Sequence, residues 1–263
     1  MIAISDNVQV RKDGPSGTIV INRPDRRNAL SREIVSMLIQ ALDDLHNERS
    51  VRAVILTGSG DTFCSGTDLH QLQETAAAKN AMAKWHEDAE SFLELVEKML
   101  RYPKPIIASV NGWVVGTGAA LMLASDIVIA TNQSKVFMPE AKRGLSASVT
   151  TPLLSFRVGA GMASGILYSG SPVDSVKAVN LGLFHEVVES DLVWARSHEI
   201  AKQCATGARE SHQMTKQMMN QTIGEGLFTQ LSIGAANMAA ARTTDAAKEG
   251  IAAFLEKRDP DWQ

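Results

Sequence analysis

The stretch "NGWVVGTGAALMLASD", residues 111–126, constrains the fold more than any other part of the chain. Glycines interrupt it at Gly112, Gly116 and Gly118, and an apolar run then continues to Ser125. Glycine loses more backbone entropy on folding than other residues, so these positions indicate a tight turn or the close approach of another group to the backbone. The stretch therefore predicts a glycine loop that leads directly into a buried helix.

Strand and helix signals alternate around this stretch. Apolar or alternating segments predict strands at 7–12, 17–22, 51–58 and 104–110, with two further short strands within 126–138. Between them, apolar residues recur every three to four positions after the capping residue Ser31, which predicts an amphipathic helix with Ile34, Leu38, Leu42 and Leu45 on its buried face. A long helix is predicted from Thr67 or Asp68 to about Leu100. This order favours parallel strands joined by right-handed helical crossovers.

The last third of the chain has a helical pattern almost throughout. From Pro152 onward, Gly159, Gly170 and Gly182 separate short helices, and longer helices are predicted at about 189–205, 209–223, 227–241 and 244–257. The chain contains no internal repeat, low-complexity tract or flexible linker. We therefore predict one α/β core with a helical C-terminal third, and we expect that third to pack on a neighbouring subunit.

Composition and charge narrow the classes of partner. The chain has 263 residues and a net charge of −3, which disfavours nucleic acid because phosphate binding needs a basic face. Two cysteines, Cys64 and Cys204, form neither a disulfide framework nor a zinc motif, and we expect both to be buried small side chains. The start "MIAISDNVQV" has no signal-peptide pattern and no apolar run is long enough to span a bilayer, so a cytoplasmic protein without membrane contact is expected.

Two glycine loops have the geometry of an anion site. Each of the loops "FCSGTDL" and "GTG" (116–118) follows a predicted strand and precedes a predicted helix. Ligands of open α/β sheets bind at this edge, and a helix start offers free backbone N–H groups to negative charge. Two such loops can direct two N–H groups at one oxygen, as in an oxyanion hole. The alternative reading is that these glycines serve only packing in strand-to-helix turns.

Five motifs, in order and with matching spacing, resemble the crotonase family of enoyl-CoA hydratases and isomerases. They are "NRPDRRNAL", "VILTGSGDTFCSGTDL", "NGWVVGTGAALMLASDIVIA", "FMPEAKRGL" and "EGIAAFLEKR", and together they extend over nearly the whole chain. The resemblance implies an α/β fold, a crotonase-like spiral of ββα units, with a helical C-terminal region for trimerisation. We place the spiral core, with the CoA-binding and catalytic residues, at 1–200 and the trimerisation region at 201–263. A homotrimer or a hexamer formed by two trimers is expected.

The resemblance also implies the chemistry. Members of the family bind an acyl-CoA thioester, with its carbonyl oxygen held by two backbone N–H groups, which match Thr67 and Thr117 here. Thr117 departs from the usual glycine and would be strained if the site required a positive φ. Hydratases of the family use two glutamates, whose positions hold Ala120 and Glu140 in this chain. Read without the resemblance, Glu140 is a solvated residue in the first turn of a helix.

A single glutamate at the second position matches the enoyl-CoA isomerases of the family, which move a proton between carbons two and four of the acyl group. We therefore predict an enoyl-CoA isomerase with Glu140 as the acid and base, no metal and no permanently bound cofactor, with coenzyme A entering as part of the substrate. One alternative is a hydratase, a lyase whose second carboxylate lies elsewhere, with Asp61, Glu74 and Glu87 as candidates. Another is a non-catalytic CoA-binding homologue.

Contacts with coenzyme A follow from the same resemblance. Besides Thr67 and Gly116, the matching positions are Arg27, Ala29, Asp68, Leu69, His70, Phe254 and Lys257. Asp68 alternatively serves only as a helix cap, and Phe254 as part of an apolar stripe with Ala247 and Ile251. The stretch "LSASVTTPLL" replaces a glycine-rich turn of the family. Ser146, Ser148, Thr150 and Thr151 either face the acyl pocket and select a polar or short acyl group, or cap the following helix.

Overall fold

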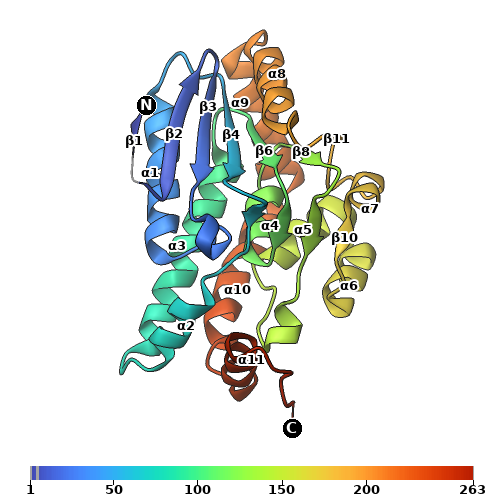
Figure 1. The fold of residues 1–263 in the computed structure, drawn as a ribbon. Coiled ribbons are helices and arrows are strands. Elements are labelled where there is room, and N and C mark those ends of the chain that lie inside the picture. Colours follow the sequence, from blue (N-terminus) through green and yellow to red (C-terminus); the bar gives the residue numbers. More distant parts are fainter. Residues whose placement is uncertain (1, 4–5, 263) are drawn as a thin grey trace.

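A seven-stranded sheet organises the structure, a computed structural model that describes residues 2–3 and 6–262 (Figure 1). Its strand order is β1-β2-β3-β4-β6-β8-β11, antiparallel from β1 to β3 and parallel from β3 onward. The strands are β1 (Ile2–Ala3), β2 (Val8–Asp13), β3 (Ser16–Ile21), β4 (Ala53–Gly58), β6 (Ile106–Val110), β8 (Ile127–Thr131) and β11 (Glu186–Val188). The predicted parallel strands and helical crossovers are confirmed.

A second sheet of four short strands lies beside the first, in the order β10-β9-β7-β5. These strands are β5 (Thr62–Cys64), β7 (Trp113–Val115), β9 (Lys135–Phe137) and β10 (Val173–Asp174). After each of β4, β6 and β8, the chain adds one short strand to this sheet before it continues. This repetition is the spiral of ββα units that the resemblance implied. β5 and β7 were predicted as loops, because three residues are too few to show an alternating pattern.

The large sheet is covered on both faces, which explains why its central strands are continuously apolar. On one face, Ala53 and Ile55 of β4 pack against α8 (Val193–Ala205). On the other, Val54 and Leu56 belong to the main core, which includes α1 (Arg32–Asn47) and α3 (Ala81–Arg101). Successive residues of β4 face opposite sides of the sheet because side chains alternate along a β-strand.

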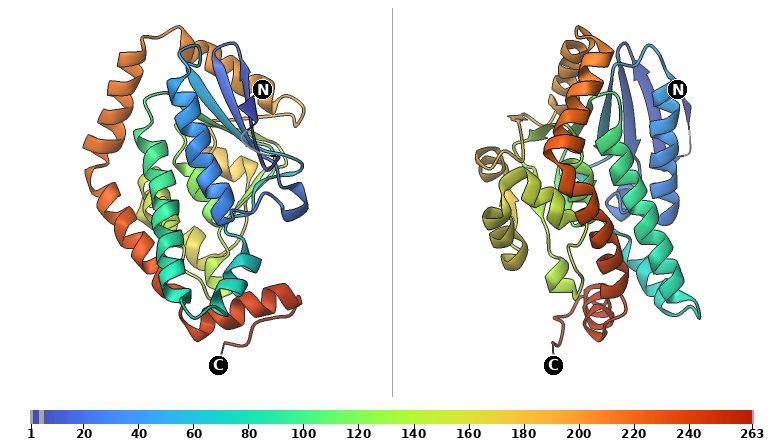
Figure 2. Two further views of the ribbon diagram at one scale, coloured as in Figure 1. Left: turned by 90° about the vertical axis from the view of Figure 1, so that its left-hand side faces the viewer. Right: turned by 180° about the vertical axis from the view of Figure 1, so that it is seen from behind.

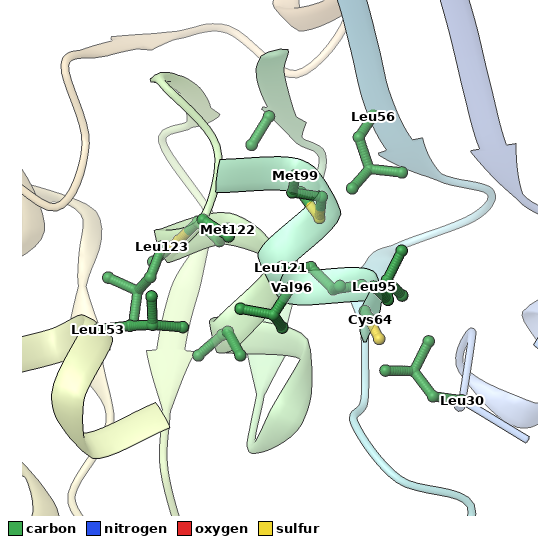
Figure 3. Packing of buried hydrophobic residues seen from close by; sticks show 14 of the residues in the cluster. Leu30, Leu56, Cys64, Leu95, Val96, Met99, Leu121, Met122, Leu123 and Leu153 are labelled. Carbon is green, nitrogen blue, oxygen red and sulfur yellow. The ribbon is translucent and has the colours of Figure 1, made fainter. Parts of the chain in front are cut away.

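The apolar run of the opening stretch forms α4 (Thr117–Leu123), whose residues from Gly118 to Leu123 are all buried. Figure 3 shows Leu121 directed toward Val96 and Leu95, and Leu123 toward Leu153. The predicted buried helix is confirmed. Cys64 is buried beside it, whereas Cys204 is only half-buried, so the expectation for the second cysteine was wrong.

The predicted long helix up to residue 100 is in fact two helices, α2 (Leu69–Ala76) and α3, separated by residues 77–80. α2 packs on α11 (Asp245–Glu256), while α3 packs on α1 and on α10 (Glu225–Ala241). One continuous helix would not reach both sets of partners, so tertiary contacts override the local helical pattern.

The C-terminal third is helical, as predicted. From residue 150 onward the described chain consists of α5 to α11 and η3, with the short strands β10 and β11 between them. The helices α9 and α10 run along one side of the molecule, and α11 lies across its end (Figure 2). The remaining elements are η1 (Pro24–Arg26), η2 (Glu140–Arg143), α5 (Thr150–Val158), α6 (Ala160–Ser169), α7 (Ser175–Asn180), α9 (Arg209–Gln217) and the π-helical η3 (Met218–Ile223). The proposed boundary at residue 200 falls inside α8, and the two-part division and the trimer remain predictions. Among the described helices, none is both long and apolar enough to cross a membrane.

Candidate active site

The two glycine loops meet at one point of the structure. The hydroxyl oxygens of Thr67 and Thr117 lie 3.0 Å apart. Gly66 has φ +83°, and a Cβ atom there would lie 2.7 Å from the carbonyl oxygen of Val115 and 3.0 Å from the Thr117 nitrogen. The loops therefore touch through a position where only glycine fits.

Backbone donors are free at this meeting point. Within the described part of the chain, the N–H groups of Thr67 and Thr117 make no hydrogen bond to the backbone or to a side chain. Thr117 is the first residue of α4, and its φ is not positive; the positive value belongs to Gly116, at +56°. The strain considered for Thr117 is therefore absent, because glycine occupies the one position that needs the unusual conformation.

Glu140 lies against the same loop. It begins the short 3-10 helix η2, is only 9% exposed, and neither of its carboxylate oxygens has a hydrogen-bond partner in the described structure. A Cβ atom built on Gly116 would lie 3.6 Å from Glu140 Oε1. Burial raises the pKa of the Glu140 carboxyl group to about 7. The alternative of a solvated first-turn residue was therefore wrong.

Glu140 is held in place by the C-terminal helix. Gly144 has φ +63°, and a Cβ atom there would lie 1.9 Å from the Ala246 carbonyl oxygen. Likewise, a Cβ atom on Gly250 would lie 2.3 Å from the Arg143 carbonyl group. Two glycines thus allow α11 to approach the backbone of η2 closely, and this contact fixes the segment that carries Glu140.

The predicted CoA-binding residues range from exposed to buried. Arg27 and His70 are exposed, and Leu69 is half-buried. Ala29 is buried, and its carbonyl oxygen accepts a hydrogen bond from Arg23. Asp68 is buried too, where it accepts hydrogen bonds from the N–H groups of two residues of α2 and pairs with Arg23 at 3.2 Å. Asp68 therefore caps α2, and its contact with coenzyme A remains a prediction.

Sequence reasoning missed Asn28, which shapes the loop between Arg27 and Ala29. Asn28 is fully buried and, like Arg27, has a positive φ. Its amide donates hydrogen bonds to the carbonyl oxygens of Ser59 and Thr62 and accepts one from the Arg23 N–H. These bonds hold a backbone conformation that is costly for a non-glycine residue. The only signal in the sequence was an Asn in a polar turn.

Phe254 does not belong to the apolar stripe of α11. Ala247 and Ile251 are buried, but Phe254 is 43% exposed and lies under the Arg143 guanidinium at 4.4 Å. Lys257 ends α11 in a left-handed conformation. Their contact with coenzyme A across a subunit interface remains a prediction.

The hydroxyl groups after Gly144 do not cap a helix. The N-cap of α5 is Val149, without a side-chain cap, so that reading was wrong. Ser148 donates to Ser146 at 2.7 Å, and Thr151 donates to the Ala147 carbonyl oxygen at 2.8 Å. Thr150 is buried, and its hydroxyl group has no partner among the described residues.

A cavity of about 200 Å³ opens on one side of Thr67. Its walls come from α1, α2, α3 and α10, with Leu72, Phe92 and Met238 among its apolar residues. Glu87 and Arg242 also line it. Of the three carboxylates considered for a hydratase, only Glu87 shares a cavity with Thr67; Asp61 and Glu74 are exposed and do not line it.

Comparisons with known proteins point to one family. A model of the enoyl-CoA hydratase/isomerase family matches residues 16–263. A candidate enoyl-CoA hydratase of Thermus thermophilus is 36% identical, over 96% of this chain and 99% of that protein. A 1,2-epoxyphenylacetyl-CoA isomerase of Escherichia coli is 31% identical, over 93% and 94% respectively. The crystal structure of an enoyl-CoA hydratase/isomerase from Xanthobacter autotrophicus superposes with a TM-score of 0.87 at 26% identity, and the match covers 96% of this chain and 97% of that one.

Proposed function

The chain belongs to the enoyl-CoA hydratase/isomerase family, and from this membership we propose that it moves a double bond within an enoyl-CoA, with Glu140 as the single acid and base. The observation that carries the proposal is the environment of Glu140: a buried carboxyl group without hydrogen-bond partners, directed at Gly116 beside the free N–H groups of Thr67 and Thr117. Relatives named as hydratase and as isomerase both match the chain, so the choice between the two reactions rests on the residues of the site.

The reaction follows from the thioester. With the carbonyl oxygen bound by the two N–H groups, the Glu140 carboxylate removes a proton from carbon two of a 3-enoyl-CoA. The electron pair of the broken C–H bond delocalises onto the thioester oxygen, where each N–H donor contributes about 3–4 kcal/mol in comparable enzymes. The protonated Glu140 then returns the proton to carbon four, and the double bond shifts to carbons two and three.

Ala120 favours this reaction over hydration. Adding water requires one group to activate the water and one to deliver a proton. By the family pattern, the first of these positions is Ala120, which is fully buried in α4 and carries no titratable group. Moving a proton between two carbons of one substrate requires a single acid and base, and Glu140 at the second position can serve as both.

The reaction is tested with a panel of 2-enoyl-, 3-enoyl- and saturated acyl-CoA thioesters in heavy water. Mass spectrometry follows deuterium uptake, double-bond movement, water addition and release of free CoA. We expect exchange at carbons two and four together with double-bond movement. Binding of the thioesters without any change in them would support a non-catalytic CoA-binding protein instead.

Hydration is the second candidate, because Glu87 lines the same cavity as Thr67. A hydratase that uses Glu87 would add water to a 2-enoyl-CoA, and Glu87→Gln would abolish that addition. Glu74→Gln is the matched control, since Glu74 is exposed on α2 and does not line the cavity. Water addition that survives in Glu87→Gln would exclude this role for Glu87.

The pH dependence of the rate reports the ionisation of Glu140. A general base acts only when it is ionised, and burial raises the pKa of this carboxyl group to about 7. We therefore expect kcat/KM to fall about tenfold per pH unit below about pH 7 and to level off above it. The measurement is kcat/KM for the best thioester between about pH 5.5 and 9. A profile that stays level from about pH 9 down to about pH 5.5 would contradict Glu140, with its raised pKa, as the base.

A further inference from the structure

The cavity beside Thr67 has an apolar part and a charged part. Leu72, Phe92 and Met238 supply apolar surface, whereas Arg32, Asp88 and Arg242 bring three charges to the same cavity. If the Thr67 N–H holds the thioester oxygen, as the proposed function requires, this cavity begins beside the reacting carbonyl group and receives the acyl chain. An apolar cavity of about 150 Å³ holds benzene, so the 200 Å³ here has room for a short acyl group.

Arg242 is a buried cation without a hydrogen-bonded acceptor. It is 6% exposed, and its side chain makes no hydrogen bond within the described part of the chain. Its closest carboxylate oxygen belongs to Asp88, at 3.7 Å from Nη1. Burial lowers the pKa of Arg242 to about 10, so the side chain remains charged at neutral pH. A buried charge of this kind is costly unless an acceptor reaches it.

Asp88 does not fill that role, because its nearest oxygen lies beyond hydrogen-bond distance of Arg242, while both of its oxygens accept hydrogen bonds from Arg32. Arg32 donates from Nε to Oδ1 at 2.5 Å and from Nη2 to Oδ2 at 2.9 Å. Arg32 is exposed and the Asp88 side chain is 14% exposed, so the buried Arg242 faces a carboxylate that already accepts hydrogen bonds from another arginine. Glu87 also lines the cavity, but it is exposed, so water screens its charge. The other polar side chains of the cavity, which include Gln71 and Ser91, are neutral.

We propose that the substrate's acyl group ends in a carboxylate, which binds the Arg242 guanidinium at the charged part of this cavity. A planar guanidinium matches the geometry of a carboxylate and binds it with two parallel hydrogen bonds. The bound carboxylate supplies the hydrogen-bond acceptor that Arg242 lacks. The enzyme therefore takes mono-CoA thioesters of short dicarboxylic acids, and the polar part of its specificity comes from Arg242 rather than from the hydroxyl groups after Gly144.

This inference rests on the proposed acyl-CoA function, and binding of unreactive thioesters tests the two separately. The probes are hexanoyl-CoA and the mono-CoA thioester of hexanedioic acid, which have the same chain length and differ only in the terminal group. Neither contains a double bond, so neither reports on isomerisation. Calorimetric titration of the native protein should show tighter binding of the carboxylate-terminated thioester.

The variant Arg242→Met keeps an unbranched apolar stem and removes the guanidinium charge. We expect it to weaken binding of the carboxylate-terminated thioester by about 10- to 100-fold and to leave hexanoyl-CoA binding unchanged or tighter. Arg242→Lys should retain part of the preference. The control is Arg11→Met on β2, since Arg11 is exposed and its side chain donates to Gln9 on the same strand.

Equal losses for both thioesters in Arg242→Met would overturn the proposal and indicate a purely structural pairing with Asp88. If that variant does not fold, titration of the native protein still tests the proposal, because tighter binding of hexanoyl-CoA than of the carboxylate-terminated thioester would overturn it. Binding of hexanoyl-CoA without any preference rejects only the carboxylate site. Failure to bind either thioester rejects the acyl-CoA function as well.

Discussion

Glu140→Gln is expected to lose proton transfer and, at the same time, to become more stable than the native protein as the pH rises. Glutamine has nearly the same shape but cannot remove a proton, so exchange at carbon two should fall by about 10²–10⁴-fold. This is the largest effect on activity that we predict, because by the proposed mechanism Glu140 performs both proton transfers.

The gain in stability follows from the raised pKa. The carboxyl group has a pKa of about 7 in the folded protein against 4.5 as its ordinary value. The folded state therefore binds the proton more tightly than the unfolded state, and stability is lost as the pH rises through this interval. At one pKa unit per about 1.4 kcal/mol, ionisation of Glu140 costs the native protein about 3 kcal/mol above pH 7. Glutamine does not ionise and escapes this cost.

Both effects are measured on the same preparations. Deuterium uptake gives the loss of proton transfer, and denaturant unfolding at about pH 5 and pH 8.5 gives the stability difference at each pH. Glu33→Gln on α1 is the control, since Glu33 is exposed and does not line the cavity. If Glu140→Gln were stabilised or destabilised equally at both pH values, the raised pKa would be wrong.

Gly144→Ala is expected to cause the largest loss of stability, about 2 to 5 kcal/mol in the free energy of unfolding. Its Cβ atom would lie 1.9 Å from the Ala246 carbonyl oxygen, and the position has φ +63°. Overpacking against backbone and a left-handed conformation therefore add to each other. Activity should fall as well, because α11 must move away from the segment that carries Glu140.

Gly182→Ala separates the two causes. Gly182 has φ +73°, but a Cβ atom there would meet no atom within 4 Å. It should lose only the conformational part, about 1–2 kcal/mol, and keep its activity. Denaturant unfolding and the initial rate of the best thioester provide both readouts. Equal losses of unfolding free energy in Gly144→Ala and Gly182→Ala would show that the contact with α11 does not contribute to stability.

The sequence predicted those parts of the fold that depend on local patterns. Strands β2, β3, β4, β6 and β8 of the large sheet and helix α4 were found because each has a run of apolar or alternating residues, whereas the short β1 and β11 were not predicted. β5 and β7 were missed, since their place in a sheet depends on partners far along the chain. The break between α2 and α3 has the same origin: different helices pack on each side of residues 77–80.

For the site, the sequence identified the candidate residues but did not predict the burial and contacts of their side chains. The motifs identified Glu140, but its burial depends on the packing around η2, so the sequence left open a solvated residue. Arg242 received no role, because it is a single charge at the end of an alanine-rich helix. Only the packing of α10 on α3 places it beside Asp88.

The contact between α11 and η2 also has a consequence for the order in which the chain matures. On the ribosome, residues 140–144 emerge about a hundred residues before the segment 245–256 that packs on them. Until that segment has been synthesised, η2 lacks the partner that fits against Gly144, and the catalytic carboxyl group is not held in position. A nascent chain that has already formed its sheets and its glycine loops is therefore expected to be inactive toward acyl-CoA thioesters until α11 packs against η2.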